Sequence, residues 1–145
     1  MKKELIGRLE IVDLPQLELF GLTAKVDTGA YTSAIHYHQA DVIERKGKEV
    51  LHFTLLDPSH EEYNDKSFYV EKFKTKYIKN SFGQAENRFI VKLKVKIHGQ
   101  EYETDFSLSN RNNLRHPVLL GRKILNKRFI VDTSKKFLST KQQTK

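Results

Sequence analysis

The feature that most constrains the fold is a long stretch in which apolar and polar residues alternate. From 87 to 97 the apolar residues are separated mainly by basic ones, and a second alternating run covers 101–109. Successive side chains of a strand point to opposite faces, so this spacing predicts two strands that each bury one face. His98-Gly99 lies between them and fits a two-residue turn. The stretch therefore predicts a β-hairpin.

The hairpin also has a predicted register, because its polar positions carry opposite charges. A two-residue turn would place three lysines opposite three acids: Lys96 opposite Glu101, Lys94 opposite Glu103 and Lys92 opposite Asp105. Each such pair contributes roughly 0.2–1 kcal/mol, and a slipped register would lose all of them. These lysines are then neutralised within the fold, and they are no sign of nucleic-acid binding.

The same period of two recurs along most of the chain, with turn residues between the runs. One short helix is expected at 121–127 and a last strand at 128–132. The other predicted strands are 5–12, 17–27, 33–38, 49–56, 67–79, 87–97, 101–109 and 117–120. Many short strands with closely spaced turns indicate an all-β barrel or sandwich.

Length and composition bound the organisation of the chain. Its 145 residues suit one domain, which we expect over 1–138, followed by a flexible basic tail over 139–145. Cysteine is absent, which excludes disulfides, thiolate zinc sites and cysteine nucleophiles. The basic start has no apolar run behind it, and no segment approaches the ~20 apolar residues of a membrane span. We therefore expect a cytoplasmic protein without a membrane partner.

The net charge of +8 raises the question of nucleic acid, but its distribution argues against that partner. Half of the excess lies in the polar C-terminal stretch, at Lys135, Lys136, Lys141 and Lys145. A second group alternates from Lys72 to Lys79 along a strand-like segment, as expected of a solvated strand face.

The first motif that carries chemistry is an apolar strand that ends in Asp27-Thr28-Gly29-Ala30. A carboxylate at the end of a rigid strand is held by the amides of the following turn, and glycine lets the backbone fold close to it. Two such carboxylates brought together share one proton and can activate a water molecule. Asp-x-Gly is also ordinary turn chemistry, and the tripeptide alone favours a simple turn.

A second segment, Pro117 to Leu125, gives the motif its context. It consists of a short apolar strand, Gly121-Arg122 and a short amphipathic stretch. In retropepsins, an Asp-Thr-Gly loop and a later apolar strand ending in Gly-Arg before a helix form the two halves of one active-site layer. Both elements occur here in that order.

Nearly the whole chain resembles the bacterial family labelled ATP-dependent zinc proteases, whose domain is retropepsin-like and is associated with RimK-type ATP-grasp ligases. The matching residues are Gly7-Arg8 with Glu10 and Leu14-Pro15; Ala24 to Ala30 followed by Thr32 to His36; and Ser109-Asn110-Arg111, Leu114, Pro117 to Arg122 and Val131-Asp132.

The resemblance implies a small closed barrel of the acid-protease fold with one short C-terminal helix. It makes Asp27 the catalytic carboxylate, supported by Thr28 and Gly29. Substrate binding or loop support is implied for Ala30, Gly121, Arg122 and Arg111. Asp132-Thr133-Ser134 is interpreted as a turn with no room for a second lobe. With one competent aspartate per chain, a homodimer would supply the second.

The family label raises zinc and ATP, and the residues favour neither. His36-Tyr37-His38 places two imidazoles on one side of a strand, and with His116 they form the alternative ligand set. No His-Glu-x-x-His helix or glycine-rich phosphate loop is present. We expect no cofactor, and any use of ATP would belong to a ligase partner.

Three functions follow from these residues. The first is a homodimeric aspartic peptidase acting on a peptide or isopeptide through Asp27. The second is a non-catalytic module of the same fold that binds a peptide or an ATP-grasp ligase. The third, which rests on the family label, is a zinc-dependent protease. The first requires the Asp27 carboxylates of two chains to meet.

Overall fold

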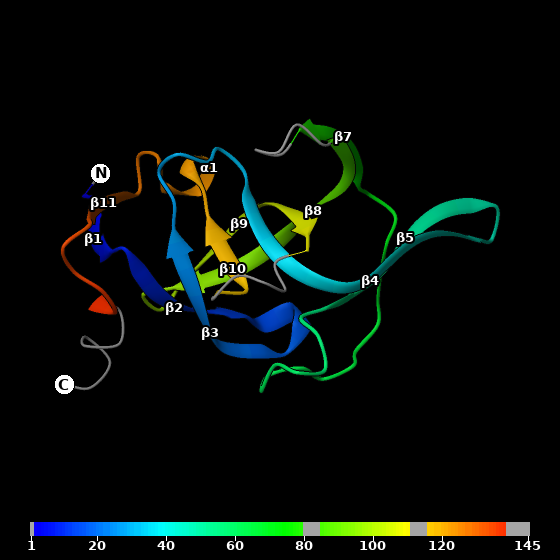
Figure 1. Ribbon diagram of the computed structural model, residues 1–145, viewed down its shortest axis with the longest axis horizontal. Coiled ribbons are helices and arrows are strands. Elements are labelled where there is room, and N and C mark those ends of the chain that lie inside the picture. Colours follow the sequence, from blue (N-terminus) through cyan, green and yellow to red (C-terminus); the bar gives the residue numbers. More distant parts are fainter. Residues whose placement is uncertain (1, 80–84, 111–115, 139–145) are drawn as a thin grey trace.

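Six strands pair in a closed ring in the computed structural model, which describes residues 2–79, 85–110 and 116–138 (Figure 1). Each strand pairs with the next around the ring, and β10 also pairs with β4, which closes it. In ring order the strands are β10 (Val118–Leu120), β3 (Leu19–Val26), β2 (Leu9–Leu14), β8 (Ala85–Ile97), β9 (Gln100–Ser109) and β4 (Ser33–Arg45).

The other elements extend this ring. Beyond β4 lie β5 (Lys48–Leu55) and β6 (Phe68–Val70), while β7 (Lys74–Lys79) pairs with β8. A separate parallel pair is formed by β1 (Glu4–Gly7) and β11 (Phe129–Asp132). The helices are short: a 3-10 turn at Pro15–Leu17 and α1 at Arg122–Leu125.

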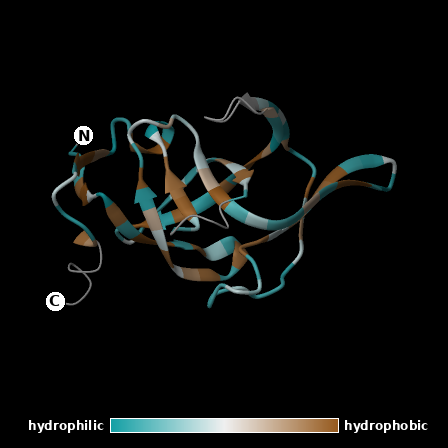
Figure 2. Ribbon diagram, in the orientation of Figure 1, coloured by the Kyte–Doolittle hydropathy of each residue, from teal (hydrophilic) through white to brown (hydrophobic). Residues whose placement is uncertain are grey.

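The buried core draws on every strand of the ring and also on β1, β5, α1 and β11, and hydrophobic residues recur along the strands in Figure 2. Burial of apolar surface of this kind is the main stabilising contribution to a domain of this size. Among the largest fully buried side chains are Phe53, Phe106, Leu22, Ile35, Leu108 and Leu120.

The predicted fold class is confirmed: the described chain is mostly β, with one short α-helix after the late apolar strand. The register of β8 and β9 is also confirmed, because all three predicted lysine–acid pairs face one another. The turn between them has φ of 54° at His98 and 78° at Gly99, both positive as in a type I′ turn.

Three predicted strands differ substantially from the structure, and the predicted helix 121–127 is limited to Arg122–Leu125. The single strand 5–12 is two strands, because the chain bends at Arg8 for β1 to pair with β11. The strand 67–79 is also two, β6 and β7, which pair with different neighbours. The strand 33–38 runs on to Arg45, since β4 leaves the ring and continues beside β5.

Gly7 shows why the first bend requires glycine. A Cβ atom there would overlap the backbone carbonyl of Lys135.

Among the described residues, no helix has the length and apolar composition that a membrane span requires. The predicted tail, 139–145, lies outside the described residues.

The charge pairs of the β8–β9 hairpin can be tested by a double-mutant cycle. Lys94→Glu should destabilise the protein by about 1 kcal/mol or less, because it places two acids opposite each other. Adding Glu103→Lys should restore part of the loss, since it re-forms an opposite pair. Chemical denaturation of the four proteins measures the coupling. Strictly additive effects would contradict a contribution from this pair.

Candidate functional site

Asp27 stands directly after β3, where that strand lies beside β10. The two strands run parallel, with Val26 opposite Leu120. The amide of Asp27 donates to the carbonyl of Leu120 at 2.9 Å, so the pairing extends to the aspartate itself. The two predicted halves of the site, far apart in the sequence, are therefore side by side (Figure 1).

The turn after Asp27 holds its carboxylate. The Gly29 amide donates to Asp27 Oδ1 at 2.9 Å, and the Ala30 amide donates to the Asp27 carbonyl at 3.3 Å. Asp27 is half-buried, whereas Thr28 and Gly29 are exposed. The loop thus presents an oriented carboxylate at the surface of the single chain.

Residues at the start of α1 hold the same loop in place through hydrogen bonds. Gly121 is buried, and its amide donates to the Ser33 hydroxyl at 3.0 Å. A Cβ atom on Gly121 would lie 2.6 Å from the Tyr31 carbonyl oxygen, so only glycine fits without a backbone shift. The next two amides, of Arg122 and Lys123, donate to the carbonyls of Ala30 and Tyr31 at 2.8 and 2.9 Å.

Arg122 reaches the loop with its side chain as well. Its Nη1 donates to the Thr28 carbonyl at 3.0 Å, and the guanidinium carbon lies 5.8 Å from the centre of the Tyr31 ring. These contacts place the guanidinium against the loop backbone, where it limits movement of the residues on either side of Gly29.

A charged pair joins this unit to β9. Lys123 Nζ lies 2.5 Å from Asp105 Oδ2, and Asp105 faces Lys92 across the hairpin. The Lys123 bond, with the charges of Lys92 and Lys74, lowers the pKa of the Asp105 carboxyl below its usual range. The α1 segment is therefore held to β9 as well as to the loop.

A cavity of about 500 Å³ opens beside the loop. One side is formed by the loop and its neighbours, including Tyr31 and Leu119, and the other by the β7–β8 hairpin. The hairpin contributes Lys76, Tyr77, Arg88 and Ile90. The loop that follows Asp27 reaches this cavity at Ala30 and Tyr31, and cationic and aromatic side chains line the opposite side.

Sequence reasoning missed the hairpin side of this cavity. The segment 67–79 was interpreted as one strand, and its lysines as a solvated face. The signal that was available is the alternation from Lys74 to Lys79, then turn residues, then the start of β8. That pattern indicates a hairpin, but it does not say which loop the hairpin faces.

The opening motif has a structural explanation. Glu10 is fully buried on β2, and its Oε2 accepts from the amides of Gly7 at 2.8 Å and Leu138 at 3.1 Å. The side chain thus joins the bend after β1 to the end of the described chain. Glu10 therefore stabilises the fold from β2, the strand next to β3.

The histidines of the alternative zinc set do not gather. His36 is buried, and its Nε2 lies 2.7 Å from Asp57 Oδ2. The hydroxyl and amide of Ser59, together with His36, hold the pKa of Asp57 below its usual range. His38 is exposed and packs edge-on against a tyrosine ring, and His116 is half-buried.

Across the part of the chain that the structure describes, no three His, Cys, Asp or Glu side chains are placed to hold a metal ion. The described residues therefore do not fit the zinc of the family label. Arg111, the remaining predicted site residue, lies outside the described residues.

Asp132, the first residue of the second Asp-Thr pair, ends β11, and the predicted turn begins after it. Its Oδ1 accepts from the Ser134 hydroxyl at 2.6 Å and the Ser134 amide at 3.0 Å. The carboxylate is thus occupied by the turn that follows β11.

Comparison with known proteins agrees with this geometry. The family described as "Retropepsin-like aspartic endopeptidase RimB" matches residues 5–142. Among curated proteins, a "Probable alpha-L-glutamate ligase" of Desulfotalea psychrophila is 31% identical over 134 residues, which are 90% of this chain and 28% of that protein. A protein of the same description from Shewanella pealeana is 29% identical over 139 residues, 93% of this chain and 30% of that protein. The chain thus spans less than a third of the length of these relatives.

A solved structure has the same fold over almost its whole length. It is the crystal structure of Lpg0085, a Legionella pneumophila protein of unknown function (DUF785). The TM-score is 0.71 at 28% identity, and the match covers 95% of this chain and 99% of that one.

The Lys123–Asp105 pair predicts a pH dependence of stability. Because the folded-state pKa of Asp105 lies below 3.8, the ordinary value of an aspartate, the pair stabilises the protein fully above pH 3.8. The contribution is lost as the pH falls from 3.8 through the lowered pKa. Asp105→Asn should reduce stability at pH 7 by about 1 kcal/mol, because the pair is partly exposed.

Denaturation at pH 7 and at pH 3 tests this, with the wild type and Asp105→Asn compared at each pH. The difference should shrink at pH 3. Lys123→Met is the control background, in which Asp105→Asn should cost less at pH 7. An equal cost at both pH values would contradict the assignment.

Proposed function

The chain belongs to the RimB-like family of retropepsin-like aspartic endopeptidases, and we propose that it is a homodimeric aspartic peptidase that acts through Asp27. The observation that carries the proposal is the position of this carboxylate. Asp27 ends β3, its Oδ1 is held by the Gly29 amide, and a peptide-sized cavity opens beside its loop. This is the placement that a water-activating carboxylate requires.

The exposure of the loop supports the homodimer. Thr28 and Gly29 are exposed, and Tyr31 is 53% exposed in the single chain. A reactive carboxylate pair works best where bulk solvent is excluded, and a second copy of the loop would cover the pair while the attacking water stays bound to it. A two-fold contact brings the same surface of two chains together, so it would set one Asp27 against the other.

In the proposed reaction the Asp27 pair shares one proton. The ionised carboxylate takes a proton from water as the water oxygen attacks the amide carbon. The other carboxyl gives its proton to the carbonyl oxygen, which yields a tetrahedral intermediate. The C–N bond then breaks as the nitrogen takes a proton from one carboxyl, while a hydroxyl of the intermediate returns a proton to the other carboxylate, which leaves an acid and an amine and restores the singly protonated pair.

For the substrate we propose an acidic peptide or isopeptide tail. Two cations, Lys76 and Arg88, line the cavity together with Tyr77, although Arg88 also pairs with Glu86 at 2.6 Å. The relatives named as glutamate ligases add support, since a hydrolase of glutamate-containing tails would act on the product of such a ligase.

A second candidate is the non-catalytic module. It is favoured by one observation: the curated relatives contain the matching segment within proteins more than three times its length. The segment would then dock an ATP-grasp ligase or its product, and Asp27 would bind without hydrolysing. Any role of ATP would belong to that partner.

Metal removal separates the peptidase from the zinc protease of the family label. We expect the purified protein to hold less than stoichiometric zinc, and a chelator to leave its melting temperature and any cleavage unchanged. Elemental analysis and a thermal scan measure this. One tightly bound zinc per chain, lost on replacing His36 or His38, would establish the metalloprotease instead.

The catalytic test is Asp27→Asn, which keeps the size of the side chain and most of its hydrogen bonds. The fold should survive, and cleavage of a glutamate-rich peptide library should fall by roughly three or more orders of magnitude. Asp132→Asn is the matched control, because Asp132 also precedes a threonine but its carboxylate serves a turn. That variant should retain full activity.

Wild-type cleavage should follow a bell in pH that belongs to the pair of carboxylates. It should also fall on dilution below the dimerisation constant, since a monomer holds half of a site. Full activity of the Asp27→Asn protein would overturn the mechanism. Inactivity of a verified wild-type dimer on every library member would favour the binding module.

A further inference from the structure

A second long hairpin projects from the body of the molecule, formed by the outer parts of β4 and β5 (Figure 1). We call residues 39–50 the arm. At its end Glu44 faces Glu49, and Arg45 faces Lys48. Like charges directly opposite each other destabilise a hairpin. The arm therefore has the reverse of the arrangement in β8–β9, where every lysine on the exposed face meets an acid.

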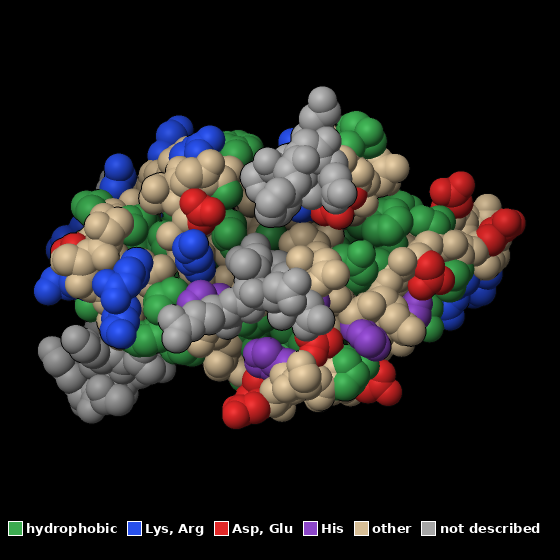
Figure 3. Space-filling model, viewed as in Figure 1, with side chains coloured by type: hydrophobic (Ala, Val, Ile, Leu, Met, Phe, Trp, Pro, Cys, Tyr) green, Lys and Arg blue, Asp and Glu red, His purple; other side chains and the backbone are tan. Residues whose placement is uncertain are grey.

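The like pairs divide the arm into two faces of opposite charge. Successive side chains of a strand alternate between faces, so Arg45 and Lys48 lie on one and Glu44 and Glu49 on the other. All four are exposed. Figure 3 shows acidic and basic side chains in separate regions at the end of the arm. We call the side of Arg45 and Lys48 the basic face.

The turn of the arm adds a third cation. Lys46 and Gly47 have φ of 52° and 78°, as in a type I′ turn. The first position of such a turn favours asparagine, aspartate or glycine, which adopt a positive φ with less strain than lysine. A lysine at this position carries a small conformational cost and enlarges the basic face.

Arg45 is held in place by a chain of contacts. Its guanidinium carbon lies 4.3 Å from the centre of the Tyr69 ring, and that ring lies 5.0 Å from the His52 ring. His52 in turn contacts Asp41 Oδ1 and the Ser67 hydroxyl, each at 3.0 Å. The basic face thus has a pre-organised arginine, which lowers the entropy lost on binding.

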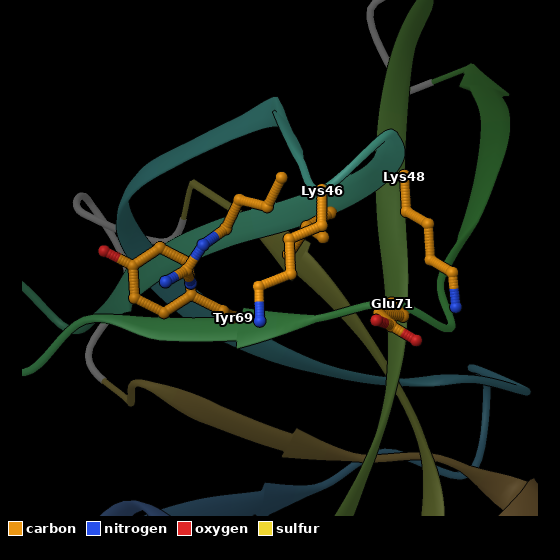
Figure 4. Close-up of a pocket in the computed structure, with 6 residues that line it drawn as sticks. Lys46, Lys48, Tyr69 and Glu71 are labelled. Atoms are coloured by element: carbon orange, nitrogen blue, oxygen red, sulfur yellow. The ribbon is translucent and has the colours of Figure 1, made fainter.

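The basic face borders an open cavity of about 310 Å³ (Figure 4). Its lining residues are Arg45, Lys46, Lys48, Val50, Tyr69 and Glu71. Glu71 lies between Lys46 and Lys48 in this view, and Val50 and Tyr69 supply apolar surface. Tyr69 is 48% exposed. Arginine and tyrosine are the residue types that most often dominate binding energy at protein interfaces. The cavity offers several cationic donors and one carboxylate acceptor.

We propose that the basic face docks an acidic segment of a separate protein. The carboxylates of that segment would bind Arg45, Lys46 and Lys48, and Glu71 would accept a hydrogen bond from its backbone or a basic side chain. Docking would relieve the repulsion between Arg45 and Lys48, so binding would be stronger than the same cations would give in a neutralised hairpin. The site lies outside the cavity beside Asp27 and is independent of the proposed hydrolysis.

The charge arrangement argues against two other occupants. A two-fold contact between copies would place one basic face on another, and a basic face on an acidic face is a head-to-tail contact that gives a ring or a filament and not the two-fold dimer proposed for Asp27. Nucleic acid would require a cationic track along many phosphates. The arm instead balances Arg45, Lys46 and Lys48 with its own acids, at Asp41, Glu44 and Glu49.

Two charge reversals on the arm form a matched test. Lys48→Glu and Glu49→Lys each convert a like pair into an opposite pair, so both should raise the melting temperature, by about 1–4 °C. Only Lys48→Glu changes the basic face. Lys3→Glu, at an exposed position, controls for the change in net charge. All variants are made in the Asp27→Asn background, so that no probe is cleaved.

The probe is a fluorescein-labelled peptide of about ten residues that alternates glutamate and threonine, measured by anisotropy at low salt. Lys48→Glu should weaken the binding of this peptide at least about fivefold. Glu49→Lys should bind the peptide as tightly as the parent protein or more tightly, and Lys3→Glu should bind it within about twofold of the parent. Absence of binding, or equal binding by Lys48→Glu, would overturn the proposal.

An oligouridylate of equal charge serves as the competing probe. It should bind more weakly than the acidic peptide, which has the same sign of charge but fits the cavity beside Glu71. Tighter binding of the oligouridylate that is lost in Lys48→Glu would assign the basic face to nucleic acid and overturn the proposal. An equal loss of peptide binding in Lys3→Glu would show that the effect comes from net charge and would overturn the proposal.

Discussion

The contact between β3 and β10 is the constraint on which the site depends. It joins segments whose ends, at Thr28 and Arg122, are 94 residues apart in the chain. Only three residue pairs make it, yet it sets the amide of Asp27 on the carbonyl of Leu120. It also presses Gly121 against the backbone of Tyr31, where a side chain has no room. Because both strands belong to a closed ring, neither can shift without breaking pairs on its other side.

Sequence predicted most where several local signals agreed. In β8–β9 the alternation, the turn residues and the charges all require the same register, and the structure has it. The length of β4 was not predictable in this way. Its pairing changes at an irregularity between Tyr37 and Gln39, where the strand leaves the ring and continues beside β5 alone. Nothing in the local alternation records such a change of partner, because a strand at an edge and one in a ring have the same period.

The residues of the candidate site also differ in how far the sequence predicted them. Asp27 and Gly121 were predicted because the Asp-Thr-Gly turn and the later apolar strand that ends in Gly-Arg together resemble the two halves of a retropepsin site. Lys76, Tyr77 and Arg88 were missed, since their role depends on where the β7–β8 hairpin lies relative to the loop. The histidine pair suggested a metal on spacing alone. Spacing on a strand can supply two ligands, but a third must come from elsewhere in the fold, and no such group of three forms among the described residues.

The two long hairpins treat charge in opposite ways, and their positions explain why the fold tolerates the difference. β8–β9 lies within the ring and, through Asp105 and Lys123, supports the loop of Asp27, so an unstable register there would disturb the site. The arm extends away from the ring. Two like pairs at ~0.2–1 kcal/mol each are a modest part of a stability of roughly 5–15 kcal/mol. A partner held on the arm would remain attached to the same rigid ring as the Asp27 loop. If its chain carries the acidic tail, the cleavage site would meet that tail at an effective concentration set by the length between them, with no further contact required.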